Sequence, residues 1–429
     1  MDRARTPTAS RRAVLGAGAL IATTPGAGRA AGPTAEAEAQ RLLEHYQSLG
    51  DKASGGPGDL ASGEWLEGEL KAMGYAVARQ AFETPAYEGD ASLRTGSAKA
   101  VVIPQAIVVP TPAEGVSGPI YLAGSRTGPG IALVVLPHAR WSTMLGAAQA
   151  RVGAAMAAGA SAVVVVTTGP TSEASALNTP AERRLFDRPV AVLAPREAEP
   201  FLKAAARGES ATLTLAGRSF RRPAFNVTAR LDRGATKTLV LSTPRSGWFS
   251  CAGERGTGLS AWWLLARWAA RTKLAVNLAL VATSGHEYEY AGGERFIAEV
   301  APKPKDTALW VHFGANVAAR DWHERGQQLS PLPSADPQRF LMCSPPLLAA
   351  AGAAFAGQPG LEQPYPVDPN QVAGELASIV KAGYDPVIGI FGSHRFHHTR
   401  ADDLRRVSPA LIPPVADAMA RVIAGALKT

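Results

Sequence analysis

The pattern of apolar residues predicts a strand, a helix and a second strand in the middle of the chain, around which the rest is organised. Residues 239–241 form an apolar run typical of a buried strand, and residues 259–271 carry apolar side chains at helical spacing. A second apolar run, 277–283, predicts the next strand. This order predicts a βαβ unit, which places chemistry on loops at the carboxyl ends of its strands. Glu254 and Glu287 both lie on such loops.

Similar patterns predict the other elements of the main domain. Helical spacing or helix-stop residues favour helices over residues 35–49, 60–73, 346–356, 374–383 and 410–426. Apolar runs favour strands over residues 75–82, 225–230, 308–313 and 386–391, the first of them at an edge of the sheet. The alternation of strands with helices predicts an α/β fold.

Between residues 97 and 218 the pattern changes to short valine and isoleucine runs separated by glycine and proline. These runs predict strands over 100–103, 106–109, 131–136, 162–167 and 190–193. One helix is predicted over 144–158. Two organisations fit this pattern: a small β-rich module inserted into the main domain, or extra strands that enlarge the main sheet.

The amino terminus has the pattern of a twin-arginine export signal. Arg11 and Arg12 precede an apolar run, 13–23, that is too short for a bilayer, which needs about 20 apolar residues. Gly28 and Ala30, on either side of Arg29, offer a small-x-small cleavage site. We therefore expect residues 1–31 to be a signal peptide, read by the twin-arginine export machinery, and the mature protein to be periplasmic or secreted without a membrane span. The alternative is that these residues form a disordered basic tail and not a signal peptide.

Composition is that of an ordinary soluble domain, with 46% hydrophobic and 19% charged residues. Removing the five arginines and one aspartate of residues 1–31 lowers the formal charge from +8 to +4. With no basic stripe in the sequence, we do not expect a nucleic-acid partner. The two cysteines, Cys251 and Cys343, allow either one disulfide or two free buried thiols.

The loop motifs resemble those of the zinc-dependent exopeptidases of peptidase family twenty-eight. In that family one strand ends in Gly-Ala-His-x-Asp-Ser, a loop carries a bridging Asp before the next helix, and the following strand ends in Glu-Glu. The corresponding positions here hold Pro244, Glu254, His286 and Glu287. The sequence HTRAD, beginning at His398, is similar to the family's final His-Thr-x-x-Asp motif, whose histidine binds metal.

Three more segments carry the resemblance. The loop DKASGGPGD at 51–59 and the strand NVTARL at 226–231 are similar to family motifs, and the insert, with its AGASAVVVV segment, resembles the protease-associated domain. The resemblance implies a phosphorylase/hydrolase-like zinc exopeptidase fold, with a mixed central sheet flanked by helices and an inserted β-rich protease-associated domain. Together with the export signal at 1–31, it divides the chain into four parts. Residues 32–96 and 219–429 are the two parts of a peptidase-like domain, and residues 97–218 are the inserted protease-associated domain.

The resemblance also implies a metal site. It predicts that Glu254, Glu287 and His398 hold a single zinc ion, since two carboxylates and an imidazole with an open position make a catalytic zinc site. The ligand set of a second ion is lost, because Pro244 and Gly314 have no side-chain donor atoms. Each predicted ligand also has an interpretation without metal. Glu254 could be an exposed acid near the amino end of a helix, Glu287 could belong to a solvated acidic loop, and His398 could simply precede a capping box.

His286 stands where the family has its catalytic base. A neutral imidazole can take a proton from water near pH 7, although His286 could instead bind the metal itself. Three further residues are additional site candidates. His312 points to the same strand face as the lost Gly314 position, Glu375 could hold a substrate amine, and His397 precedes His398.

Two kinds of function follow. The first is an exported, divergent metallopeptidase-like hydrolase, of aminopeptidase type, that acts on peptides or small amides. The alternative is a catalytically inactive homologue that uses the old cleft to bind peptides or another exported ligand. The replacements at Pro244, His286 and Gly314 favour the alternative, whereas Glu254, Glu287 and His398 favour the enzyme.

Overall fold

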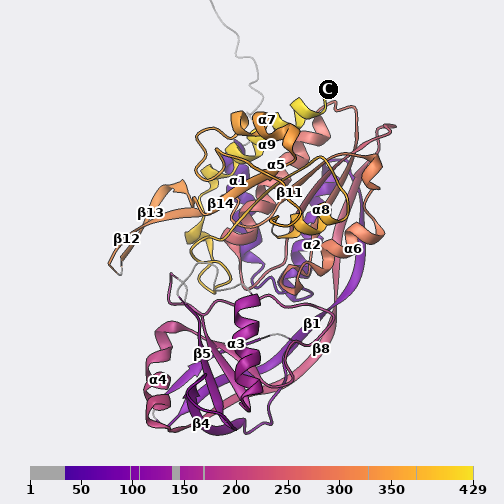
Figure 1. Cartoon of the computed structure of the whole chain (residues 1–429). Helices are drawn as coiled ribbons and strands as arrows, with labels where there is room; N and C mark the ends of the chain where they lie inside the picture. The colour runs from indigo at the N-terminus through magenta and orange to yellow at the C-terminus, as the bar shows by residue number, and fades with distance from the viewer. Residues whose placement is uncertain are drawn as a thin grey trace, which may run out of the picture. The chain divides into compact units, whose positions relative to one another are not determined.

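A mixed sheet forms the centre of the fold (Figure 1). The computed structural model describes residues 34–96, 98–105, 107–137, 145–167, 170–326, 328–372 and 374–428. Neighbouring parallel strands follow the order β16 (Val387–Gly392), β11 (Thr307–Phe313), β9 (Thr238–Pro244) and β10 (Asn277–Thr283). Antiparallel strands β14 (Arg339–Cys343) and β8 (Ser210–Leu231) flank them, and the two-residue β15 (Tyr365–Pro366) pairs with β14. The predicted mixed α/β sheet is therefore confirmed.

Helices cover both faces of this sheet because its central strands are apolar on both sides. One face packs against α1 (Ala35–Ser48), α2 (Pro57–Ala72), α5 (Thr257–Arg271), α7 (Leu348–Ala354) and α9 (Pro413–Ala426). The other packs against α6 (Ala291–Glu299) and α8 (Glu375–Lys381). Successive residues of β9 alternate between the two cores: Leu239 and Leu241 belong to the first, and Val240 to the second.

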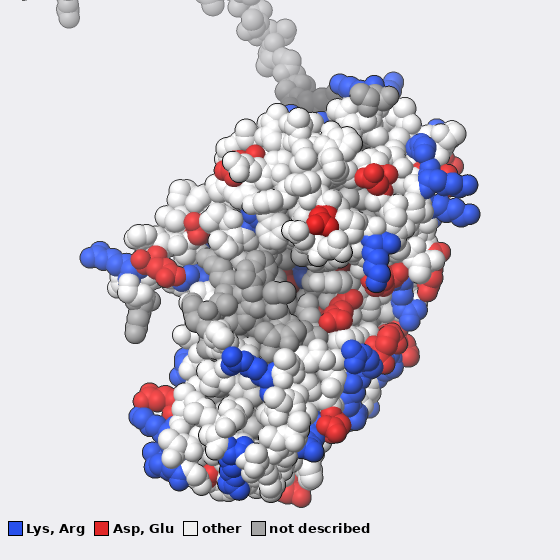
Figure 2. Space-filling view, in the orientation of Figure 1, with Lys and Arg blue, Asp and Glu red and all other residues white. Residues whose placement is uncertain are grey.

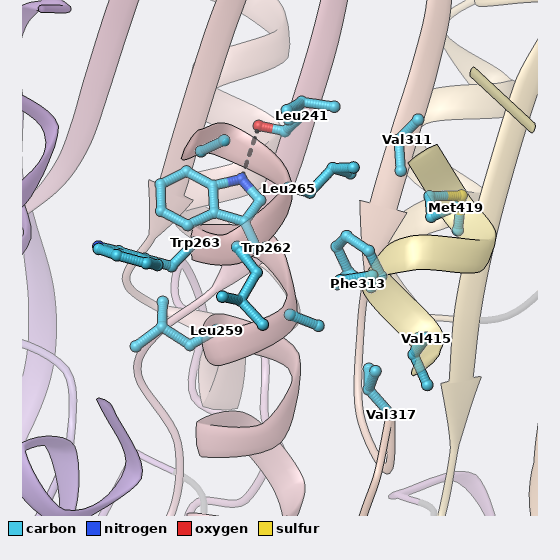
Figure 3. Close-up of a cluster of buried hydrophobic side chains, with 14 of the residues drawn as sticks. Leu241, Leu259, Trp262, Trp263, Leu265, Val311, Phe313, Val317, Val415 and Met419 are labelled. Atoms are coloured by element: carbon cyan, nitrogen blue, oxygen red, sulfur yellow. Dashed lines mark hydrogen bonds between the residues drawn. The ribbon is translucent and has the colours of Figure 1, made fainter. Parts of the chain in front are cut away.

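Trp262 of α5 fixes the helix against the sheet (Figure 3). Its side chain is fully buried, and its indole Nε1 donates to the Leu241 carbonyl oxygen at 3.1 Å. Phe313, at the end of β11, belongs to the same core. The start of α5 is thereby held beside the carboxyl ends of β9 and β11, where the loop of Glu254 lies.

The insert lies between two long paired strands. β1 (Ala76–Thr95) and β8 pair antiparallel over the whole length of β1, from the main sheet into the insert. The other insert elements are β2 (Lys99–Val101), β3 (Ile103–Pro104), β4 (Val116–Leu122), β5 (Ile131–Val135), α3 (Leu145–Ala157), β6 (Ala162–Val166), β7 (Val190–Leu193) and α4 (Ala198–Arg207).

This insert combines features of both predicted organisations. One apolar core lies within the insert and its connecting strands, and a second also includes Phe249 of the main domain. Strand β8 pairs with β10 of the main sheet at one end and with β4 of the insert at the other. The hydrogen-bond ladder therefore crosses the predicted boundary at residue 218 without a break. The domain boundaries and the protease-associated identity of the insert stay predictions.

Some elements differ from the apolar pattern. The edge strand predicted at 75–82 is much longer, and residues 107–109 of one predicted strand are not in a strand. Helices α4 and α6, strand β14, and the hairpin of β12 (Arg320–Arg325) and β13 (Gln328–Ala335) were not predicted. The hairpin strands are largely exposed and carry charged, polar and proline residues, so they lack the apolar run that marks a buried strand.

The expectations about export, membrane spans, cysteines and surface charge have different outcomes. The predicted signal peptide, 1–31, lies outside the described residues. Among the described helices, none combines the length and apolar character needed to cross a membrane. Cys251 and Cys343 are free and buried, so the alternative without a disulfide is confirmed. On the described part of the face in Figure 2, basic and acidic side chains are interspersed.

Candidate functional site

A short loop between β9 and α5 carries Glu254. Cys251 has a left-handed backbone (φ 37°), and the π-helical turn Ala252–Gly256 then leads into α5. The Asp402 carboxylate accepts the backbone N–H groups of Gly253 at 2.7 Å and Glu254 at 3.0 Å. These bonds satisfy two N–H groups in a buried turn and fix the direction in which Glu254 leaves the backbone.

Asp402 also joins His394 to the site. His394 Nε2 lies 3.2 Å from Asp402 Oδ2. Burial opposes protonation of His394, but the charge and hydrogen bond of Asp402 outweigh it and raise the histidine's pKa. Neither residue was among the predicted site residues. Asp402 is the last residue of the HTRAD sequence, so the motif held a signal for it.

Glu254, His397 and His398 converge on one point. His398 Nε2 lies 3.1 Å and His397 Nε2 3.8 Å from Glu254 Oε1. One donor atom from each residue falls within 4.8 Å of the others, and among the described residues this is the group of His, Cys, Asp or Glu able to hold a metal. The structure therefore brings two predicted ligands, Glu254 and His398, together with the additional candidate His397.

The backbone of His398 explains how two adjacent histidines face the same carboxylate. Its φ is +57°, in the left-handed region that side chains other than glycine seldom adopt. The rings of His397 and His398 consequently stack, with centroids 4.1 Å apart and planes 19° apart. Strain of this kind persists only where surrounding contacts impose it, and it concentrates at functional sites.

The insert supplies such a contact. His398 Nδ1 lies 2.9 Å from the Ala176 carbonyl oxygen, and the Ala176 N–H donates to the His398 carbonyl at 2.9 Å. Because a carbonyl only accepts, Nδ1 carries the hydrogen. Nε2 is then the ring nitrogen that faces Glu254, at 3.1 Å from Oε1. Metal-binding histidines are commonly oriented by this type of bond.

Charge at the site favours an ionised Glu254. Burial alone would raise its pKa, but the Arg255 guanidinium and the two histidines outweigh burial and hold the pKa well below its usual value. Arg255 is itself fully buried, and its Nη2 donates to Glu254 Oε1 at 2.5 Å. Burial lowers the pKa of His397 well below its usual value, which keeps that ring neutral. The importance of Arg255 was not predicted from the sequence.

The donor set fits a zinc ion. Arg255 occupies Oε1 of Glu254, whereas Oε2 is buried and has no hydrogen-bond partner among the described residues. His397 Nδ1 is also buried without one. Two imidazoles and a carboxylate are a known catalytic zinc set, and a cation here would satisfy lone pairs that otherwise face one another.

Glu287, the third predicted ligand, belongs to a different group of contacts. Its Oε1 accepts the Ser54 N–H at 2.5 Å, and its Oε2 accepts the Ser246 hydroxyl at 2.8 Å. Burial raises its pKa to about 7 despite these hydrogen bonds. Within the described residues, Glu287 is not part of the cluster formed by Glu254, His397 and His398.

The remaining candidates form a second polar group around Glu375. His286 Nδ1 lies 3.4 Å from Glu375 Oε1, and His312 Nε2 lies 3.8 Å from Glu375 Oε2. Burial, helped by the Arg255 cation, lowers the pKa of His286 well below its usual value and that of His312 to about 3. Burial raises the pKa of Glu375 to about 7.

Gly314 leaves room for this second group. A Cβ at this position would lie 2.9 Å from the Ile390 carbonyl oxygen and 3.4 Å from Nε2 of His312. A side chain at position 314 would therefore crowd the Ile390 carbonyl oxygen and would also touch the His312 ring.

Comparison with solved structures identifies the fold. An aminopeptidase from Aneurinibacillus sp. strain AM-1 matches over 90% of this chain and 93% of its own, with 18% identity and a TM-score of 0.63. BSAP, a zinc aminopeptidase from Bacillus subtilis, matches over 92% and 95%, with 14% identity and a TM-score of 0.70. The chain has the zinc aminopeptidase fold.

A family twenty-eight peptidase precursor from Shewanella amazonensis SB2B agrees with this. It matches over 92% of this chain and 96% of its own, with 16% identity and a TM-score of 0.66. No protein-family model and no curated protein sequence matches the chain. The resemblance seen in the motifs is thus confirmed as a shared zinc-aminopeptidase fold, in a chain whose sequence has diverged far from these neighbours.

Proposed function

We propose that this chain is a hydrolase that removes amino-terminal residues from peptides or small amides, with one zinc ion held by Glu254, His397 and His398. The observation that carries the proposal is the convergence of two buried residues, Glu254 and His398, with the partly buried His397, including a Glu254 oxygen without a partner among the described residues. The fold neighbours, which are aminopeptidases, support the substrate class.

Each side chain has a distinct part in this proposal. A zinc ion bound here supplies Lewis-acid chemistry that polarises a scissile carbonyl. His398 is held in one tautomer by the Ala176 carbonyl, and Asp402 fixes the Glu254 backbone. His286 is the proposed general base: its lowered pKa keeps the ring neutral near pH 7, so it can accept a proton from an attacking water.

The proposal is for one ion rather than two. Pro244 and Gly314 offer no side-chain donors, and the buried Arg255 cation already neutralises part of the charge of Glu254. A second divalent ion beside Arg255 would meet like-charge repulsion in a buried environment.

Zinc content and turnover together test the proposal. The purified protein, reconstituted with zinc, should bind one equivalent and hydrolyse amino-acid p-nitroanilides, amino-acid amides or dipeptides. Glu254→Ala and His398→Ala should lose both properties, while His323→Ala, a change at an exposed histidine of the hairpin, should keep them. Absence of zinc binding and of turnover in the reconstituted protein would refute the hydrolase.

The second candidate is a binding protein without catalysis. The observation that favours it is the contact set of Glu287, whose carboxylate is engaged by Ser54 and Ser246. In that case peptides should raise the melting temperature without being cleaved. Zinc-dependent cleavage that disappears in His398→Ala would exclude this candidate.

We also propose that the twin-arginine machinery exports the protein to the periplasm or beyond. The support is the sequence of residues 1–31 alone. Replacement of Arg11 and Arg12 by lysine should retain a reporter-tagged chain in the cytoplasm, while lysine at Arg3 and Arg5 should not. Export that continues after the Arg11 and Arg12 changes would refute this route.

A further inference from the structure

Four polar side chains from separate elements form a connected chain that ends at the proposed base, His286. Ser242 comes from β9, His312 from β11, Glu375 from the start of α8, and His286 from the loop after β10. Three of them, Ser242, His312 and Glu375, line a cavity of about 10 Å³, which is room for about one water molecule. In this arrangement the Glu375 carboxylate lies against His286 and His312.

The direction of the hydrogen bonds can be followed from one end. The indole of Trp310 can only donate, and its Nε1 donates to Ser242 Oγ at 2.8 Å. The Ser242 hydroxyl hydrogen then points either to His312 Nδ1 at 2.9 Å or to the Val311 carbonyl oxygen at 3.4 Å. The shorter contact makes His312 Nδ1 the acceptor. The ring hydrogen of His312 then lies on Nε2, which faces Glu375 Oε2 at 3.8 Å.

The other carboxylate oxygen faces His286. Thr283 Oγ1 donates to Glu375 Oε1 at 3.3 Å, and His286 Nδ1 lies 3.4 Å from the same oxygen. An ionised carboxylate only accepts hydrogen bonds, so Nδ1 of His286 must carry the ring hydrogen. Nε2 of His286 is then left with a free lone pair.

We infer that Glu375 is a positioning residue that fixes His286 in the Nδ1–H tautomer and so makes Nε2 the atom that accepts the proton. The histidine and carboxylate together would replace the single carboxylate base expected at this position of the fold. The geometry resembles the logic of a catalytic triad, in which a buried acid orients an imidazole. The catalytic use of Nε2 rests on the proposed function, whereas the tautomer does not.

Other charged groups face this pair and act equally in the variants compared below. The charges of Arg255, Glu254 and both cluster histidines reach His286, whose ring also packs against Tyr290, with centroids 4.9 Å apart. Those of Arg255, Glu294 and Glu287 reach Glu375. The experiments are therefore made at one fixed pH, 8.5, where Glu375 is ionised.

Nitrogen NMR of the ¹⁵N-histidine-labelled full chain tests the tautomer without any substrate. The His286 signal is assigned by its loss in His286→Gln. In the unchanged protein, Nδ1 should have the shift of a protonated nitrogen and Nε2 that of a bare one. In Glu375→Ala, the population should move toward Nε2–H, while Glu299→Ala, a change at an exposed acid of α6, should change nothing. A protonated Nε2 in the unchanged protein would overturn the inference.

Kinetics give the second readout. Glu375→Ala should lower kcat by roughly 100-fold with KM changed less than about twofold, since general-base catalysis contributes about 10² to 10⁴. Glu375→Gln, which keeps an accepting oxygen, should recover part of the rate. Equal kcat in Glu375→Ala and the unchanged enzyme would overturn the inference. If His286 has the Nδ1–H tautomer but the protein shows no turnover, the proposed hydrolase is refuted and the inference about the tautomer stands.

Discussion

Nε2 of His398 lies 3.1 Å from Oε1 of Glu254, although the two residues are 144 positions apart in the chain. The contact depends on a third partner, because the Ala176 carbonyl of the insert holds the opposite nitrogen of His398. Residues far apart in sequence therefore define the candidate site together. The insert contributes to it through its backbone, which no side-chain motif could reveal.

The identity of the third ligand can be tested directly. His397→Ala should weaken zinc binding by more than about 100-fold, because loss of a ligand exceeds the roughly 10- to 100-fold effect of losing an outer-shell partner. Glu287→Ala should change zinc affinity much less, since its carboxylate contacts Ser54 and Ser246. Competition with a zinc-binding dye measures both. A larger loss in Glu287→Ala would restore the ligand set predicted from the sequence.

Asp402 is expected to stabilise the loop that presents Glu254. Asp402→Ala leaves the buried N–H groups of Gly253 and Glu254 without their acceptor, and each such group costs about 1–3 kcal/mol. The free energy of unfolding should fall by about 2–6 kcal/mol in urea titrations. Asp403→Ala, a change at the adjacent acid, serves as the control and should cost less. If Asp402→Ala and Asp403→Ala lose the same free energy of unfolding, Asp402 does not anchor the loop.

Glu375 should make stability depend on pH. Its pKa is raised to about 7 in the fold, against 4.5 for an unperturbed carboxyl, so the folded chain retains a proton that the unfolded chain has released. The stabilisation by this protonated group is fully present below about pH 4.5 and is lost as pH rises through 7. The total change is about 3 kcal/mol.

Glu375→Gln isolates that contribution because its amide does not titrate. The variant and the unchanged protein should have similar free energies of unfolding at pH 5, and the variant should be more stable at pH 8. Glu287, His286 and the other titrating groups are common to both proteins. Urea titrations at the two pH values measure both free energies of unfolding. If the variant and the unchanged protein differ by the same amount at pH 5 and at pH 8, the raised pKa of Glu375 is contradicted.

Arg255 should stabilise the site most when zinc is removed. In Arg255→Met the Glu254 carboxylate loses its buried partner, and breaking such a pair costs about 3–5 kcal/mol. A bound zinc ion would then supply the missing positive charge. The rise in melting temperature on adding zinc should be larger in Arg255→Met than in the unchanged protein.

Arg79→Met is the matched control for this effect. Arg79 pairs with Glu67 while its own side chain is 45% exposed, and exposed pairs contribute at most about 1 kcal/mol. Its response to zinc should equal that of the unchanged protein. A zinc response in Arg255→Met no larger than in this control would show that Arg255 and the ion do not share Glu254.

The apolar sequence pattern was sufficient to predict the central architecture. Runs such as 277–283 are buried on both faces in the structure, and a strand with that environment needs uninterrupted apolar residues. The hairpin of β12 and β13 was missed for the same reason, since its strands are largely exposed. The loop motifs likewise directed attention to Glu254 and His398, which the fold brings into contact.

The sequence by itself determined the order of the elements and the chemical groups on the loops that follow them. It could do so because buried strands and helices require apolar residues at regular intervals. Only the tertiary structure decided which groups meet. The left-handed backbone at His398 turns His397 toward Glu254, and burial places Arg255 against the same carboxylate. These outcomes depend on contacts between distant segments, which local patterns do not encode.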